Sequence, residues 1–211
     1  MTAEKITYEQ SDSLLELGNI GAAHAATTLS TMLSALIGIQ IPNISFIKIE
    51  ELHKHLDTGE VAHVIVQIQG DVHSGGYVIL HIPKGSAAKL TNLMTGCGDP
   101  NPDRELTEMD RSAIDELGNI MVSAFLDACA ELLDLVLLPS PPTSVIDIPH
   151  AVIESILLTL PGIEDIDEIV LFKTDLTCAD HHIDCNITFL PSKEMLSLMI
   201  ERLDNLLSSE V

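Results

Sequence analysis

Two long stretches of the chain alternate apolar and polar residues with the period of a helix, one starting after Thr7 and the other after Thr107. Apolar positions three or four residues apart are typical of a helix with one buried face. Each threonine is suited to be an N-cap, because a Gln or Asp follows three residues later and can complete a capping box. The pattern therefore predicts helices that run to about Leu36 and Leu135.

The same succession of extended segments follows each helix. Pro42 and Pro142 mark the change from helix to extended chain. Alternating and β-branched runs then predict strands over residues 44–49, 61–69 and 75–82, and again over 144–148, 168–177 and 183–190. Short helices are expected over 86–94 and 192–207. A linker rich in proline, Asp99-Pro100-Asn101-Pro102, separates the two sets.

The two halves are copies of one pattern. The segment Glu16-Leu17-Gly18-Asn19-Ile20 recurs as Glu116-Leu117-Gly118-Asn119-Ile120, and the same offset relates the capping threonines and the two prolines. We predict an α+β fold that is a tandem duplication with pseudo-two-fold symmetry. One mainly antiparallel sheet of about six strands would be packed by helices. The chain, residues 1–211, would form a single domain of repeats at about 6–98 and 106–208.

A helical projection separates each long helix into a core side and a polar side. The core stripe of the first helix comprises Leu14, Leu17, Gly21, Ala25, Thr28 and Met32, and that of the second comprises Ile114, Leu117, Met121, Phe125 and Leu132. The opposite sides carry Asp12, Glu16, Asn19 and Ala23 in one copy and Ser112, Glu116, Asn119 and Ser123 in the other. The glutamate and the asparagine are identical in both copies, whereas the core residues vary.

Two interpretations of the repeated pentapeptide stay open at this level. Asn and Gly are poor residues for the middle of a helix, and Gly costs about 1 kcal/mol relative to Ala. Their repetition indicates that something approaches the helix closely, where a carboxylate and a carboxamide project one turn apart. The alternative is that the glycines let the two helices pack on each other while the asparagines form a hydrogen bond between them.

Composition and charge exclude several classes of function. The formal charge of −22 disfavours binding to nucleic acid and to an anionic membrane surface. No Lys, Arg, Asp or Glu lies between Glu16 and Lys48, a length sufficient to span a bilayer, but abundant small and polar residues and Pro42 favour a buried helix over membrane insertion. Four cysteines are no disulfide framework, and the first residues lack the features of a secretory signal. We therefore expect a cytoplasmic protein.

The polar side of each helix resembles the CheC/CheX/FliY family of chemotaxis phosphatases. The pattern of that family is Asp or Ser, Glu four residues later, Asn three after that, and Pro some twenty-odd residues further on. This sequence matches the pattern twice, with Asp12, Glu16, Asn19 and Pro42 and with Ser112, Glu116, Asn119 and Pro142. A complete Glu and Asn set in both copies is more similar to CheC than to CheX, which carries one such set.

The resemblance implies an enzyme that accelerates loss of phosphate from the aspartyl phosphate of a CheY-type response regulator. Each asparagine would orient the attacking water, each glutamate would pair with a Lys of the regulator, and each glycine would permit close backbone approach. The implied catalytic residues are Glu16, Asn19, Glu116 and Asn119. The implied partner contacts are Asp12, Gly18, Ser112 and Gly118. No metal site is expected in this chain, because the Mg²⁺ would arrive with the regulator.

A second reading is a non-catalytic adaptor. The resemblance supplies a partner for it, because CheC proteins bind CheD, a receptor-modifying deamidase. A zinc site over Cys178-Ala-Asp-His181-His182-Ile-Asp184-Cys185 is disfavoured, because the spacing fits no standard ligand pattern. His53, His55 and Asp57 are more consistent with a loop. The other histidines, including His63, His73 and His81, show no paired spacing.

Overall fold

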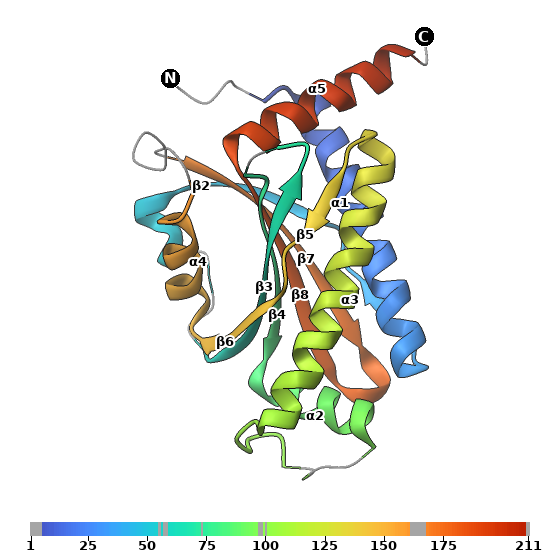
Figure 1. Cartoon of the computed structure of the whole chain (residues 1–211), viewed down its shortest axis with the longest axis vertical. Coiled ribbons are helices and arrows are strands. Elements are labelled where there is room, and N and C mark those ends of the chain that lie inside the picture. Colours follow the sequence, from blue (N-terminus) through green and yellow to red (C-terminus); the bar gives the residue numbers. More distant parts are fainter. Residues whose placement is uncertain are drawn as a thin grey trace.

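The computed structural model describes residues 6–54, 56, 59–72, 74–96, 99, 101–160 and 168–209 (Figure 1). His55, Asp57, His73 and Pro100 lie outside the described residues. The α-helices are α1 (Tyr8–Leu33), α2 (Lys84–Thr95), α3 (Glu108–Leu133), α4 (Pro149–Leu157) and α5 (Lys193–Ser209). The strands are β1 (Gly38–Ile39), β2 (Asn43–Lys48), β3 (Val61–Gly70), β4 (Gly76–Pro83), β5 (Leu137–Pro139), β6 (Thr143–Asp147), β7 (Glu168–Cys178) and β8 (Ile183–Pro191). The described residues also include the 3₁₀ segments η1 (Ile49–Lys54) and η3 (Ala179–His181).

The predicted α+β architecture is confirmed, with additions. Both long helices, the six predicted strands and the two shorter helices are present at nearly the expected bounds. The sheet has eight strands because β1 and β5, of two and three residues, are too short to show an alternation in the sequence. Helix α4 and η1 were not predicted either. The long helices end slightly before the predicted positions, at residues Ser34 and Asp134 in the left-handed conformation with φ of 51°.

The strands of the two repeats are interleaved in one antiparallel sheet. The order is β1-β7-β8-β4-β3-β5, with β2 also pairing with β7 and β6 with β3. The strand that follows each long helix therefore pairs with the hairpin of the other repeat. Strands β4 and β8 form the central pair, where the two hairpins meet. Each half of the chain depends on the other to complete its part of the sheet.

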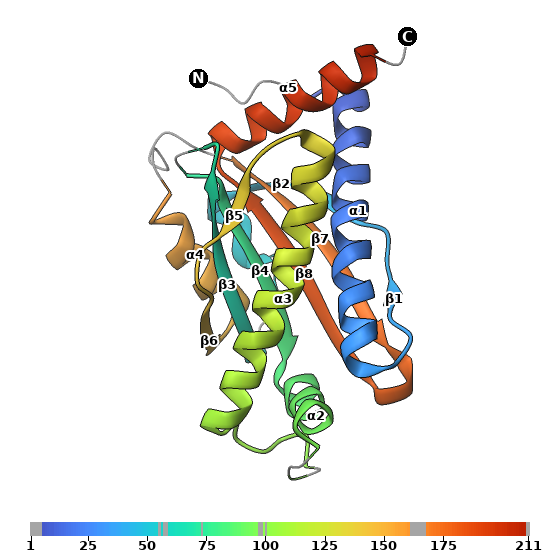
Figure 2. The same cartoon turned by 45° about the vertical axis from the view of Figure 1, so that its right-hand side comes forward.

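Helices α1 and α3 lie side by side and antiparallel on one face of the sheet (Figure 2). They are in close contact at Gly21, where an added Cβ would lie 2.7 Å from Cε2 of Phe125. The other face is covered by α4 and η1, which pack on Ile79 of β4 and Leu171 of β7. No helix in the part of the chain that the structure describes combines the length and apolar character needed to cross a membrane.

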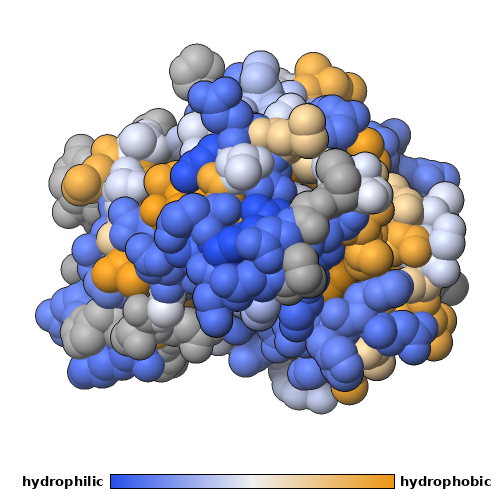
Figure 3. Space-filling model, turned by 90° about the horizontal axis from the view of Figure 1, so that it is seen from below, coloured by the Kyte–Doolittle hydropathy of each residue, from blue (hydrophilic) through white to orange (hydrophobic). Residues whose placement is uncertain are grey.

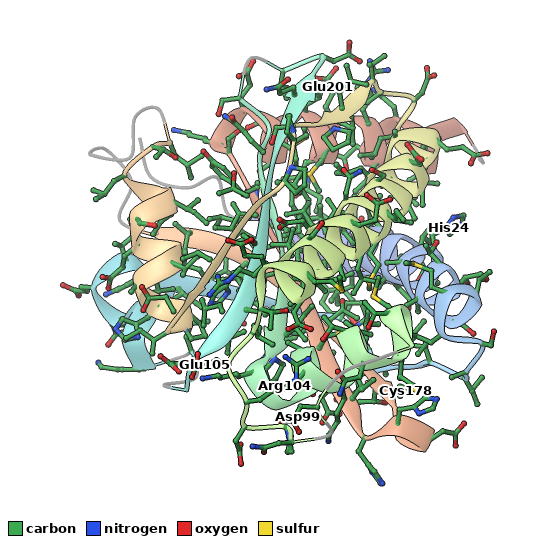
Figure 4. The ribbon with its side chains drawn as sticks, turned by 60° about the horizontal axis from the view of Figure 1, so that its bottom comes forward. His24, Asp99, Arg104, Glu105, Cys178 and Glu201 are labelled. Atoms are coloured by element: carbon green, nitrogen blue, oxygen red, sulfur yellow. The ribbon has the colours of Figure 1, made fainter. Side chains whose placement is uncertain are left out.

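The predicted capping boxes are present at the start of both long helices. Oγ1 of Thr7 accepts a hydrogen bond from the backbone N–H of Gln10, and Thr107 does the same for Asp110. At α3 the cap is reinforced from the linker, where Arg104 donates to both carboxylate oxygens of Asp110 at 2.6 and 2.7 Å. Figure 4 shows Arg104 between α2 and α3, near Asp99. The linker thus fixes the direction in which the second motif-bearing helix begins.

Candidate functional site

The polar side of α1 faces solvent. Asp12, Glu16 and Asn19 are all exposed, whereas Leu17 and Gly18 between them are buried. The capped start of the helix and its apolar stripe together determine this orientation, because Leu14 and Leu17 are almost completely buried against the sheet and α3. The carboxylate and the carboxamide therefore project one helical turn apart on an open surface.

The second copy on α3 has the same arrangement with one difference. Ser112 and Glu116 are exposed, and Asn119 is half-buried. The side-chain amide of neither Asn19 nor Asn119 forms a hydrogen bond to any of the described residues. The interpretation in which these amides join the two helices by a hydrogen bond therefore has no support in the described contacts.

The motif glycines lie against the protein's own fold, and partner approach at these glycines stays a prediction. Both are buried and face the protein's own sheet. A Cβ on Gly118 would lie 2.5 Å from Cγ1 of Val64 in β3, and one on Gly18 would lie 3.6 Å from Cβ of Pro42. Gly118 is required because α3 lies directly on β3 at this point. The close approach that Gly118 permits is therefore internal, to β3, and this glycine lies about 100° around the helix from Asn119.

The chemistry on these surfaces is that of a neutral amide beside a free carboxylate. Among the described residues, neither Glu16 nor Glu116 forms an ion pair with a basic side chain. A carboxamide can donate and accept hydrogen bonds at once without a charge. A carboxylate without an internal counter-ion can pair with a cation brought by another molecule. Each surface is thus suited to hold a small polar molecule against a docked partner.

Cys178, Cys185 and the histidines near them were considered for a metal site. No group of three or more His, Cys, Asp or Glu side chains among the described residues has an arrangement that could hold a metal ion. Cys178 and Cys185 are buried strand residues, whereas His182 is exposed. Burial raises the pKa of the Cys185 thiol to about 12, so it remains protonated at neutral pH.

Sequence reasoning missed a buried histidine pair. His63 and His81 are directly opposite each other in β3 and β4, and their Nδ1 atoms are 2.7 Å apart. Strand alternation puts them on the face covered by α4 and η1, away from α1 and α3. Burial lowers the pKa of both imidazoles. Residues 18 positions apart become neighbours only through the hairpin register, so their spacing gave no signal.

The sequence and the fold are both similar to those of known chemotaxis proteins. A model of the CheC-like family matches residues 109–146, which include the second motif. The chain is 32% identical to CheY-P phosphatase CheC of Bacillus subtilis over 162 residues, which are 74% of this chain and 75% of that protein.

Two solved structures share the fold. The crystal structure of Thermotoga maritima FliY matches with a TM-score of 0.74 at 24% identity, covering 95% of this chain and 98% of that chain. A chain of the CheX–CheY–BeF₃–Mg²⁺ complex from Borrelia burgdorferi matches with a TM-score of 0.54 at 18% identity, covering 90% of this chain and 100% of that chain. Together with the identity to the Bacillus protein over most of both lengths, the duplicated motif shows that this chain belongs to the CheC family.

Proposed function

We propose that this protein is a phosphatase that accelerates hydrolysis of the aspartyl phosphate of a CheY-type response regulator. The observation that carries the proposal is the Asn and Glu pair on the outer side of both α1 and α3, exposed on α1 and with Asn119 half-buried on α3. The relative in Bacillus is named as a phosphatase of phosphorylated CheY, and a structural neighbour comes from a complex with CheY. Both comparisons support the same class of substrate.

In the proposed reaction, the regulator docks with its aspartyl phosphate against the exposed amide. The amide of Asn19 or Asn119 holds a water in line with the bond that will break. The water oxygen forms a bond to phosphorus while the acyl oxygen–phosphorus bond breaks. The regulator's aspartate leaves as a carboxylate, and the protons of the water pass to inorganic phosphate and solvent. A neutral amide suits this position, because a carboxylate would repel the phosphoryl oxygens.

Glu16 and Glu116 would orient the partner. Each lies one turn before its asparagine, exposed and without a basic partner among the described residues. A lysine beside the regulator's phosphorylation site could pair with this carboxylate and align the regulator on the helix. Mg²⁺ would be held by the regulator, and its chemistry there is neutralisation of charge on the phosphoryl group.

The test is a dephosphorylation assay with radiolabelled regulator and purified wild type, Asn19→Ala, Asn119→Ala and the double variant. The double variant should lose about 100-fold or more in rate, as expected when a positioned hydrogen-bonding group is removed. Replacement of both residues by Asp should be equally damaging. Asn205→Ala is the matched control, because Asn205 is an exposed asparagine on α5. A double variant with wild-type rate would rule out water positioning by these amides.

The same assay separates the enzyme from the adaptor. A regulator phosphate lifetime shortened by this protein alone supports the phosphatase. An unchanged lifetime, together with binding of CheD, would favour the adaptor reading.

A further inference from the structure

The polar sides of α1 and α3, here called the two motif surfaces, carry different residues around the shared Glu and Asn. At about 100° per residue, Tyr8 lies within about 40° of Asp12 and Asn19 on α1, roughly 16 Å along the helix from the amide. The side chain of Tyr8 is 87% exposed. Its counterpart at the same offset on α3 is Glu108, also exposed. An aromatic side chain in the first repeat thus corresponds to a carboxylate in the second.

Two more apolar side chains are exposed on the segment that follows α1. Pro42 faces Gly18, the residue before Asn19, because a Cβ added to Gly18 would lie 3.6 Å from Cβ of Pro42. The residue before Pro42, Ile41, is 90% exposed. Phe46 lies on edge strand β2, on the same face of the sheet as Ile44, which packs against the core beneath α1. Phe46 is 46% exposed.

The corresponding positions in the second repeat are less apolar at the surface. Ile41 corresponds to the exposed Pro141, and Phe46 corresponds to the half-buried Ile146. Seen from below, the molecule has a mainly hydrophilic centre and hydrophobic residues at its right-hand edge (Figure 3). At the three positions occupied by Tyr8, Ile41 and Phe46, the first repeat is thus the more apolar of the two.

The net charges of α1 and α3 also differ between the two motif surfaces. Helix α1 carries three acidic residues and no Lys or Arg, a net charge of −3 with histidine neutral. Helix α3 carries six acidic residues and one arginine, a net charge of −5. Repulsion of an anionic phosphorylated surface is weaker at α1. Aromatic side chains are enriched among the residues that dominate binding, whereas Asp and Glu are depleted in interface cores.

We propose that the α1 surface, comprising Tyr8, Asp12, Asn19, Ile41 and Phe46, is the principal docking surface for the phosphorylated receiver domain of the regulator. Tyr8 and Phe46 are its anchors, and the α3 surface binds the same partner more weakly. The proposal rests on the proposed function for the identity of the partner. The inference itself is that the two motifs share the same Glu and Asn, whereas their docking surfaces bind the regulator with different affinity.

The experiment measures binding, so that it does not depend on hydrolysis. A dye-labelled CheY-type regulator from the same genome, activated with beryllofluoride and Mg²⁺, is titrated with wild type, Tyr8→Ala and Phe46→Ala, with fluorescence anisotropy as the readout. Each variant should raise the dissociation constant at least 10-fold. Tyr8→Phe should retain binding close to wild type, because it keeps the aromatic ring. Thermal unfolding of each variant separates a lost anchor from a lost fold.

The controls remove exposed apolar side chains elsewhere. Met109 is 64% exposed in the first turn of α3, and Leu158 is 81% exposed after α4. Met109→Ala and Leu158→Ala should change the dissociation constant less than 2-fold.

Equal weakening by Met109→Ala and Tyr8→Ala, or full binding by folded Tyr8→Ala, would overturn the proposal. Such a result with intact dephosphorylation would leave the proposed function standing. Tyr8-dependent binding without dephosphorylation would instead overturn the proposed function alone.

Discussion

The imidazoles of His63 and His81 share one short hydrogen bond between their Nδ1 atoms, 2.7 Å apart, inside the sheet. Nε2 of His63 lies 3.1 Å from the backbone carbonyl of Asp147, which can only accept, so this nitrogen carries the proton. In the neutral pair, Nδ1 of His81 must then donate to Nδ1 of His63. Nε2 of His81 is left without a hydrogen-bond partner among the described residues. The pair joins β3, β4 and β6, and the bond between the two Nδ1 atoms is lost when both rings are protonated, because both atoms are then donors.

This pair predicts a loss of stability in mild acid. Burial lowers the pKa of His63, while burial, His63 and Lys173 lower that of His81. The unfolded chain therefore binds protons more readily than the folded protein. The stabilisation is complete above the unfolded pKa of about 6.5 and decreases as the pH falls below it. Urea midpoints should be lower at about pH 5.5 than at about pH 7.5.

His81→Gln should flatten this dependence. His24→Gln is its control, because His24 is exposed on α1 and points away from the body of the molecule in Figure 4. Equal urea midpoints at both pH values in wild type would contradict the assigned protonation state.

The two motif glycines should respond differently to alanine. In Gly118→Ala the new methyl would meet Val64 at 2.5 Å, and overpacking of this kind costs about 1–3 kcal/mol. In Gly18→Ala all contacts are at least 3.6 Å, so the gain in helix propensity of about 1 kcal/mol should dominate. Urea denaturation should show Gly18→Ala to be the more stable variant. The reverse order would mean that α3 does not lie directly on β3.

Removal of Arg104 should be the most destabilising change at the linker. The side chains of Arg104 and Asp110 are only 10% and 8% exposed, and the guanidinium holds the pKa of Asp110 well below its usual range. Arg104→Ala would leave a carboxylate at the cap of α3 without its counter-ion, which costs about 3–5 kcal/mol. Lys54→Ala, at the exposed ion pair with Glu51, should cost about 0–1 kcal/mol. Similar unfolding free energies for the two variants would contradict this account.

The interleaved sheet predicts that the halves cannot fold alone. A fragment ending in the linker near residue 99 would lack β7, on which β2 pairs, and the complementary fragment would lack β3, on which β6 pairs. Each fragment should give the amide NMR spectrum of an unfolded chain, and an equimolar mixture should recover dispersed signals. A dispersed spectrum from either fragment alone would show that pairing between the repeats is dispensable.

Much of the fold could be read directly from local patterns. Apolar spacing and the capping boxes at Thr7 and Thr107 are local properties, so both long helices were predicted with nearly correct bounds. Alternation likewise predicted the strands of both hairpins. Helix α4 was missed because its apolar run is short and follows a strand directly.

For the candidate site, the sequence alone determined that Glu16 and Asn19, with their copies, share one helix side opposite the core stripe, because helical geometry connects residues three positions apart. Tertiary structure decided what no local pattern records. In the folded chain, Gly118 faces Val64 and Gly18 faces Pro42. His63 forms a hydrogen bond with His81, and strand β2 of the first repeat pairs with β7 of the second. These relationships join residues far apart in the chain, and only the packing of the whole sheet specifies which of them meet.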